Sequence, residues 1–103
     1  MTTQELEIIF LQDIGEPFAT DNRRLFLRSA LSGARAAIEQ TGITLSKESD
    51  EGGITALDAE LIRMFAAWRV RGRASNEPMP PMLRRALHSR LFAEKMSEED
   101  SDA

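Results

Sequence analysis

Residues 57–96, LDAELIRMFAAWRVRGRASNEPMPPMLRRALHSRLFAEKM, hold the strongest helical pattern of the chain. In the first half of this stretch, Leu57, Leu61, Met64 and Trp68 recur at spacings of four, three and four residues. Side chains at these spacings lie on one face of an α-helix. Further apolar residues lie beside this stripe and widen it, so we expect this helix to be the most buried element of the fold.

A second helix is expected after the proline-containing connection. Pro80 and Pro81 mark its start. The N–H groups in the first turn of a helix have no partner within the helix, so proline, which lacks an N–H, loses no hydrogen bond there. Leu83, Leu87 and Leu91 then follow at spacings of four, which gives this helix an apolar face. The two helices are expected to pack against each other through these faces.

The N-terminal residues predict a short amphipathic helix. Thr2 and Glu5 have the spacing of a capping box, in which each side chain bonds the backbone N–H of the other residue. Leu6 and Phe10 provide apolar contacts, and the helix is expected to end near Gly15. A helix this short needs packing against the rest of the fold to persist.

A longer helix is expected next, with Thr20 or Asp21 as its cap. It ends at Thr41-Gly42, because glycine readily adopts the left-handed conformation of a helix end. Many small side chains on this helix allow another helix to approach closely, either a neighbour in the fold or a copy of the subunit. The short chain favours the neighbour. The apolar stripe of the helix consists of Leu27, Leu31, Ala34 and Ile38.

Residues 43–56 are the least organised interior stretch. Their apolar ends can pair as a small hairpin across Gly52-Gly53. An exposed polar loop is the preferred interpretation, because residues 47–51 are mostly charged and adjacent glycines are flexible. Thr55 is placed to cap the helix that follows.

The sequence therefore predicts an all-α fold, a small four-helix domain over residues 1–96 with a polar loop between the second and third helices. Residues 97–103, SEEDSDA, carry four acids and no apolar anchor, which predicts a disordered tail. The helices are expected near residues 3–13, 21–41, 56–72 and 80–96. The expected core consists of Leu27, Leu31, Ile38, Leu61, Met64, Phe65, Trp68, Leu83 and Leu87.

Composition narrows the classes of function. The 103 residues suffice for one domain, and the absence of cysteine excludes disulfides and thiolate metal sites. No apolar run approaches the roughly 18 residues of a membrane span, and the acidic N-terminus is unlike a signal peptide. We therefore expect a protein that assembles in a cytoplasm and has no membrane partner.

No catalytic motif occurs in the sequence. His88 is the only histidine, and without a carboxylate at helical spacing it is a poor general base and a poor metal ligand. No serine lies in a nucleophile motif, and no glycine loop of the phosphate-binding type is present. We expect neither catalysis nor a cofactor.

Charge is strongly segregated along the chain. Residues 1–62 carry 5 Lys/Arg and 11 Asp/Glu, residues 63–95 carry 8 and 2, and residues 96–103 carry 0 and 4. A subunit of this kind can stack on its own copies or present a basic face to nucleic acid, although arginines also simply solvate helix surfaces. The candidate contacts to a partner or to DNA are Arg69, Arg71, Arg73, Arg84, Arg85 and Arg90.

A helix-turn-helix DNA reader is the alternative. Two helices are joined, and the second carries three of these arginines. The connection over residues 72–79 is longer than the three or four residues that this motif normally uses.

Taken together, the helices resemble the head-tail connector (adaptor, or head-completion) proteins of tailed bacteriophages and prophages, which are small and all-helical. The resemblance covers residues 2–92. Departures are Trp68-Arg69, where the family often has tyrosine before the arginine, and the acidic tail. The matching pieces are TTQELEIIFLQDIG (2–15), DNRRLFLRSALSGARAAIEQTG (21–42), DAELIRMFAAWRVRGR (58–73) and MPPMLRRALHSRLF (79–92).

This resemblance implies a structural, non-catalytic subunit of the virion, assembled in the bacterial host cytoplasm. Such a subunit forms a homo-oligomeric ring between the portal protein and a tail-side completion protein, lengthens the DNA channel used in DNA packaging, and makes at most non-specific contact with DNA. Polar loop 43–53 and the tail are the segments expected to order on docking. The alternative from another class stays a small helical DNA-binding or regulatory protein.

Overall fold

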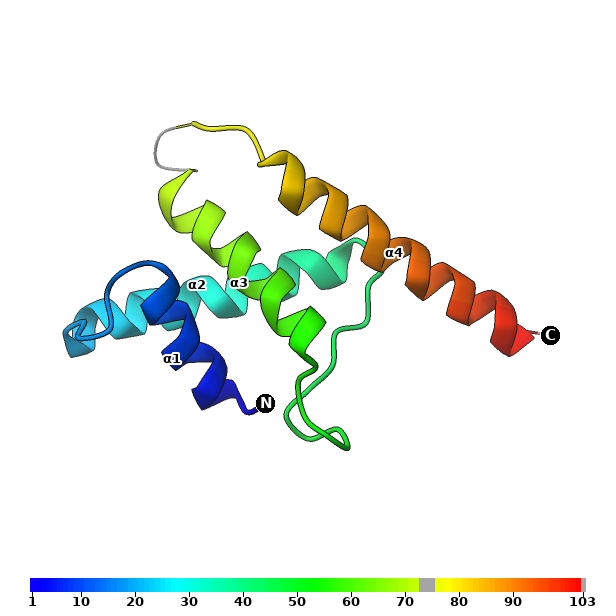
Figure 1. Cartoon of the computed structure of the whole chain (residues 1–103), viewed down its shortest axis with the longest axis horizontal. Helices are drawn as coiled ribbons and strands as arrows, with labels where there is room; N and C mark the ends of the chain where they lie inside the picture. Colours follow the sequence, from blue (N-terminus) through cyan, green and yellow to red (C-terminus); the bar gives the residue numbers. More distant parts are fainter. Residues whose placement is uncertain (73–75, 103) are drawn as a thin grey trace.

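A computed structural model describes residues 1–72 and 76–102, and the side chains of residues 1–72 and 76–97. Within this part of the chain all regular structure is helical, which confirms the all-α prediction. The helices are α1 (Thr3–Asp13), α2 (Asp21–Gln40), α3 (Ala56–Arg71) and α4 (Pro81–Asp102) (Figure 1). Their starts and ends lie within one residue of the predicted ones, except at the end of α4.

The third helix is the centre of the fold. Figure 1 shows α3 crossing α2, with α1 on one side and α4 on the other. The contact between α2 and α3 is the most extensive in the molecule, and α3 contributes six buried residues. This confirms α3 as the most buried element. The last turns of α4 lead away from the other helices, along the longest, 50 Å dimension of the molecule.

Threonine caps begin the first three helices. Thr2, Thr20 and Thr55 each accept a hydrogen bond from the backbone N–H three residues later. At α1 the predicted capping box is complete, because Glu5 also accepts from the N–H of Thr2. At α3 the carboxylate of Asp58 does not return to the cap and bonds other partners, described below.

The expected core is confirmed in part. Met64, Trp68 and Leu87 are only partly buried and pack against the rest of the core from its edge. The core also includes residues of α1 and of the 43–55 loop that the prediction left out, because a short helix and an irregular loop carry weak periodic signals. Six expected core residues are buried, namely Leu27, Leu31, Ile38, Leu61, Phe65 and Leu83.

The loop between α2 and α3 is polar at its tip and apolar at its ends. It forms no strand, so the alternative of a small hairpin is wrong. Residues 47–51 are exposed, as expected for a polar loop, whereas Ile43, Leu45 and Ile54 are at most 3% exposed. These three side chains attach the loop to the core.

The helix α4 is longer than the sequence predicted. Its backbone stays helical to Asp102, whereas a disordered tail was expected from residue 97. The segment holds no glycine or proline to stop a helix, so the backbone can continue without apolar contacts. Ala103 lies outside the described residues.

Candidate interaction surfaces

Three of the six candidate arginines hold the helices together. The Arg69 Nη1 donates to the carbonyl of Gly33 on α2 at 2.9 Å. The guanidinium lies so close to this glycine that a Cβ at position 33 would be 3.3 Å from it. The Arg71 Nη2 donates to the carbonyl of Ile14 at the end of α1. Arg69 and Arg71, the two candidates on α3, therefore bind backbone carbonyls of neighbouring elements.

The third, Arg90 on α4, joins three elements. Its Nε donates to Asp58 Oδ1 of α3 at 2.9 Å, its Nη2 to the carbonyl of Thr44 in the loop at 2.8 Å, and its Nη1 to Glu94 at 2.9 Å. Ser46 completes the cluster, because both its N–H and its hydroxyl lie 2.8 Å from the other carboxylate oxygen of Asp58. The network ties α4 and the loop to α3.

Asp58 is ionised within this network although it is only 3% exposed. Burial alone disfavours the charged form, but the hydrogen bonds from Arg90 and Ser46 together outweigh it and lower the pKa of Asp58 below its ordinary value. The hydrogen bond to Asp58 in turn raises the pKa of Arg90. The pair connects α4 to α3.

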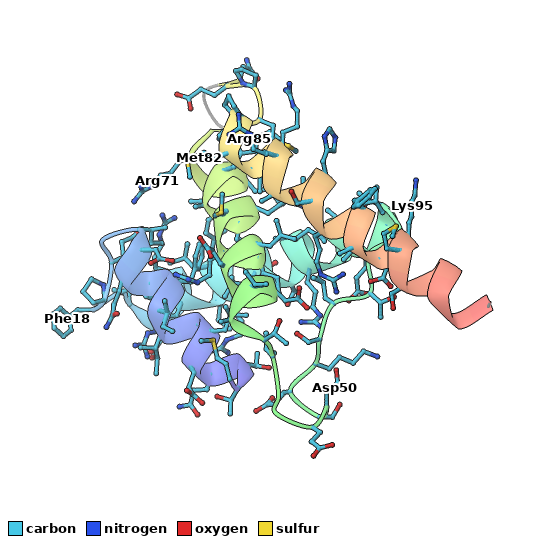
Figure 2. The ribbon with its side chains drawn as sticks, turned by 45° about the vertical axis from the view of Figure 1, so that its right-hand side comes forward. Phe18, Asp50, Arg71, Met82, Arg85 and Lys95 are labelled. Atoms are coloured by element: carbon cyan, nitrogen blue, oxygen red, sulfur yellow. The ribbon has the colours of Figure 1, made fainter. Side chains whose placement is uncertain are left out.

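Arg84 and Arg85 remain as exposed cations. Both lie in the first turns of α4, and neither side chain forms a hydrogen bond or ion pair with the described residues (Figure 2). His88 is exposed one turn further along. Arg73, the last candidate, lies outside the described residues. The basic surface available to a partner is therefore smaller than the sequence indicated.

Part of the opposite charge of the acidic and basic segments is paired inside the fold. Arg63 of the basic segment forms an ion pair with Asp13 of the acidic segment at 2.6 Å, and Arg90 does the same with Asp58. Opposite charges that lie far apart in the chain thus neutralise each other at helix contacts. The dipolar arrangement suggested by the sequence is weakened accordingly.

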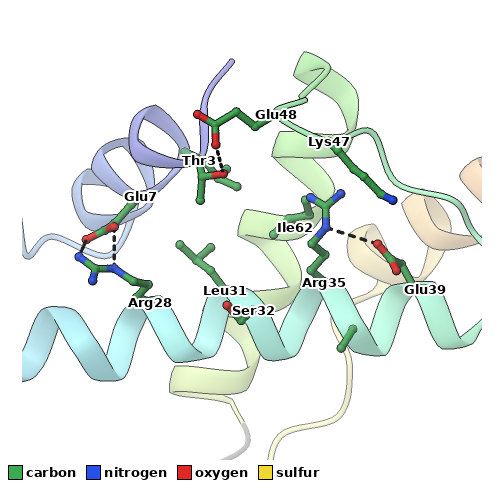
Figure 3. Close-up of a pocket in the computed structure, with 12 residues that line it drawn as sticks. Thr3, Glu7, Arg28, Leu31, Ser32, Arg35, Glu39, Lys47, Glu48 and Ile62 are labelled. Carbon is green, nitrogen blue, oxygen red and sulfur yellow. Dashed lines mark hydrogen bonds and ion pairs between the residues drawn. The ribbon is translucent and has the colours of Figure 1, made fainter. Parts of the chain in front are cut away.

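A groove of about 480 Å³ lies between α1, α2 and the loop (Figure 3). Four of its six charged side chains form ion pairs: Arg28 forms two hydrogen bonds with Glu7, and Arg35 pairs with Glu39 at 3.3 Å while it donates to the carbonyl of Ser46. Glu48 accepts from the hydroxyl of Thr3 at 3.0 Å. These contacts connect the walls of the groove.

Exposed large apolar side chains gather elsewhere, in two places. The first, the corner patch, consists of Phe18, Leu25 and Phe26, which are 97%, 59% and 52% exposed. Phe18 lies in the turn between α1 and α2 and projects away from the molecule (Figure 2). Arg23 covers one face of the Phe26 ring at 5.1 Å and pairs with Glu16.

The second place is a groove of about 340 Å³ between α3 and α4, the α3/α4 groove. Its exposed apolar residues are Leu57 and Met82, at 76% and 73%. Phe92 and Met96, further along α4, are 67% and 45% exposed. Apolar surface on this scale is typical of a contact with another protein. The groove is lined by Leu57, Glu60, Leu61, Met64, Met82, Ala86, Ser89, Arg90 and Ala93.

Sequence reasoning did not single out either surface. The helical stripe predicted that Leu57 faces inward, whereas it is 76% exposed. The predicted apolar face of α4 included Met82, which is 73% exposed. The sequence pattern made no prediction for Phe18. An aromatic side chain next to Pro17, in a turn too short to bury it, was the signal available.

Two further findings concern sites of other kinds. Among the described residues, no three His, Cys, Asp or Glu side chains gather closely enough to hold a metal ion. In the same part of the chain, no helix is long and apolar enough to cross a membrane.

No protein-family model, curated protein or solved structure matches the chain.

Proposed function

We propose that the protein is a non-catalytic head-tail connector subunit of a tailed phage or prophage. It assembles as a ring between the portal protein and a tail-side completion protein and extends the channel for DNA. Assembly takes place in the bacterial host cytoplasm, and the product is part of the virion. The proposal rests on the resemblance of residues 2–92 to such proteins and on one structural observation.

That observation is the presence of two different apolar surfaces at separate places. The corner patch lies at one end of the longest dimension, and α4 leads to the other (Figures 1 and 2). A contact between two unlike surfaces leaves one of each free on every subunit, so it propagates and closes into a ring when the rotation allows. An enzyme or a monomeric regulator needs no such pair of surfaces.

The first turns of α4 are proposed to meet the portal or the DNA channel. Arg84 and Arg85 are the described candidates whose charge the fold does not use. Their contact with DNA would be to phosphates and therefore indifferent to sequence.

The second candidate function is that of a small DNA-binding or regulatory protein. The exposure of Arg84, Arg85 and His88 on one helix favours it. A regulator binds its preferred sequence at least about 10³-fold more tightly than bulk DNA at physiological salt, whereas a connector shows no such preference. Competition of labelled genomic fragments against bulk DNA separates the two.

Sedimentation with purified portal rings from the same genome tests the connector proposal. The protein is expected to sediment with the rings in a fixed molar ratio that saturates. Arg84→Ala is expected to weaken this binding, with Lys95→Ala as the matched control at an exposed position further along α4. A protein that never sediments with the portal, and prefers one DNA sequence strongly, contradicts the proposal.

A further inference from the structure

The two apolar surfaces cannot satisfy each other within one chain. Phe18 projects at one end of the molecule, whereas the α3/α4 groove lies along α4, which leads toward the other end (Figures 1 and 2). Of the large apolar side chains that are exposed in the described residues, Phe18, Leu25 and Phe26 form the corner patch, and Leu57 and Met82 line the groove. The others are Ile8 on α1 and, further along α4, Phe92 and Met96. A surface that covers both must come from outside the chain.

The α4 side of the groove has the pattern of a seam for another helix. Met82, Ala86, Ser89, Ala93 and Met96 follow one another at spacings of four, three, four and three residues. This alternation is that of the a and d positions of a coiled coil. The three small residues in its middle allow a helix backbone to come close, and the methionines at both ends can adapt their shape to a partner.

The corner patch offers the first turns of a helix and a projecting aromatic side chain. Leu25 and Phe26 are exposed on the first turns of α2, and Phe18 lies in the turn that precedes this helix. An exposed helix of this kind can lie in an apolar groove. Phe18, at 97% exposure, is the side chain with most area to bury.

Charge at the rims of the two surfaces is complementary. Asp21, three residues after Phe18, is exposed, and its side chain forms no hydrogen bond or ion pair with the described residues. Arg85 stands one turn from Met82 in the same condition. When Phe18 lies near Met82, these opposite charges come together.

We infer that the α3/α4 groove binds the corner patch of a second copy of this chain, with Phe18 as the main anchor and Asp21 facing Arg85. The inference rests on the proposed function for its ring, but the contact itself needs no portal. Neighbouring subunits then meet through the α3/α4 groove of one and the corner patch of the next.

Cysteine cross-linking tests this contact directly, because the chain has no cysteine of its own. Pro17→Cys, beside the anchor, and Ser89→Cys, in the lining of the groove, are made separately, mixed, and treated with a short bismaleimide at high protein concentration. Both changes leave Phe18 and Met82 in place, and a dimer that joins Cys at 17 of one chain to Cys at 89 of another is expected. The double variant should give a ladder of longer products, because each subunit then carries both halves of the contact.

Glu51→Cys, exposed at the tip of the loop, is the matched control and should give only background products. Dimers that join two copies of position 89, with none between 17 and 89, overturn the inference and point to a symmetric contact of α4 with itself. Absence of any 17-to-89 product above the Glu51→Cys background also overturns it. Neither result depends on the portal, so failure here is distinct from failure of the connector proposal.

Charge reversal gives a second measurement. Asp21→Arg alone and Arg85→Asp alone are each expected to reduce the yield of the 17-to-89 product, and the two combined in one mixture to restore it. Phe18→Ser is expected to weaken self-association about 30-fold, the size of the loss at a main anchor. Equal yields from all charge variants contradict the assigned pairing.

Discussion

The body of α1, α2 and α3 and the helix α4 treat their apolar side chains differently. In the body, long stripes such as Leu27, Leu31 and Ile38 are covered by neighbouring helices. Among the described side chains of α4 only Leu83 is buried, whereas Met82 and Phe92 face solvent. Both regions carry the same periodic pattern of apolar residues. The pattern therefore predicts an apolar helix face, but it does not distinguish a face that packs within the chain from one that stays exposed for another protein.

The arginines differ in the same way. Arg69 and Arg71 of α3 bind backbone carbonyls of α2 and of the end of α1, and Arg90 attaches α4 through Asp58. Arg84 and Arg85, on the first turns of α4, have no such partner among the described residues. The body thus uses its charges for stability, and the start of α4 keeps its charges for contact.

The largest predicted effect is at the link between the two regions. Asp58→Ala should lower the free energy of unfolding by about 3 kcal/mol, because it leaves the partly buried Arg90 without its main partner. Urea denaturation measures the change. Glu60→Ala, an exposed acid on the same helix, is the control and should stay within about 0.5 kcal/mol. A loss of stability no larger than that of Glu60→Ala would show that the Asp58–Arg90 pair does not stabilise the fold.

Trp68→Ala is expected to cost less, about 2 kcal/mol, because the side chain is only partly buried. Its ring meets Phe65 edge to face at 5.7 Å, and its Nε1 donates to the carbonyl of Glu77 at 3.2 Å. Trp68→Phe keeps the ring contact and should recover about half of the loss in thermal or urea denaturation. A change of 4 kcal/mol or more would indicate a fully buried side chain and contradict the structure.

Helix ends were predictable from sequence because their determinants are local. Thr2, Thr20 and Thr55 act on N–H groups three residues away, and Gly42 ends α2 with a φ of +105°. The site was not predictable in this way. The acceptors of Arg69 and Arg71 are backbone carbonyls, which any residue possesses, so no residue type reveals them in advance.

The pH dependence of stability should show the Asp58 link as a smaller effect. The folded state lowers the pKa of Asp58, so the unfolded state binds more protons in acid. Stability from this group is complete above the ordinary carboxyl pKa near 3.8 and is lost as pH falls through the lower folded value. Asp58→Asn should therefore lose less stability than the wild type between pH 5 and pH 3 in urea titrations. Parallel curves would contradict the ionised pair.

The smallest effect on stability is expected at the start of α4. Arg84→Ala/Arg85→Ala should change the free energy of unfolding by less than about 0.5 kcal/mol, because both side chains are exposed. Arg84→Ala alone, at an arginine outside the inferred subunit contact, should reduce the slope of log binding constant against log salt for DNA by about 1, for one lost phosphate contact. An unchanged slope would show that Arg84 does not touch DNA and leave a protein partner for it.

The central claim is that the subunits assemble through two unlike apolar surfaces, and light scattering tests it most directly. The masses of the wild type, Phe18→Asp, Met82→Asp and an equal mixture of the two variants are measured over rising protein concentration. The account predicts assembly of the wild type beyond a dimer, monomers for each variant alone, and a heterodimer in the mixture, because one intact contact remains there. A Phe18→Asp variant that assembles as well as the wild type, or a wild type that stops at a dimer, would contradict it.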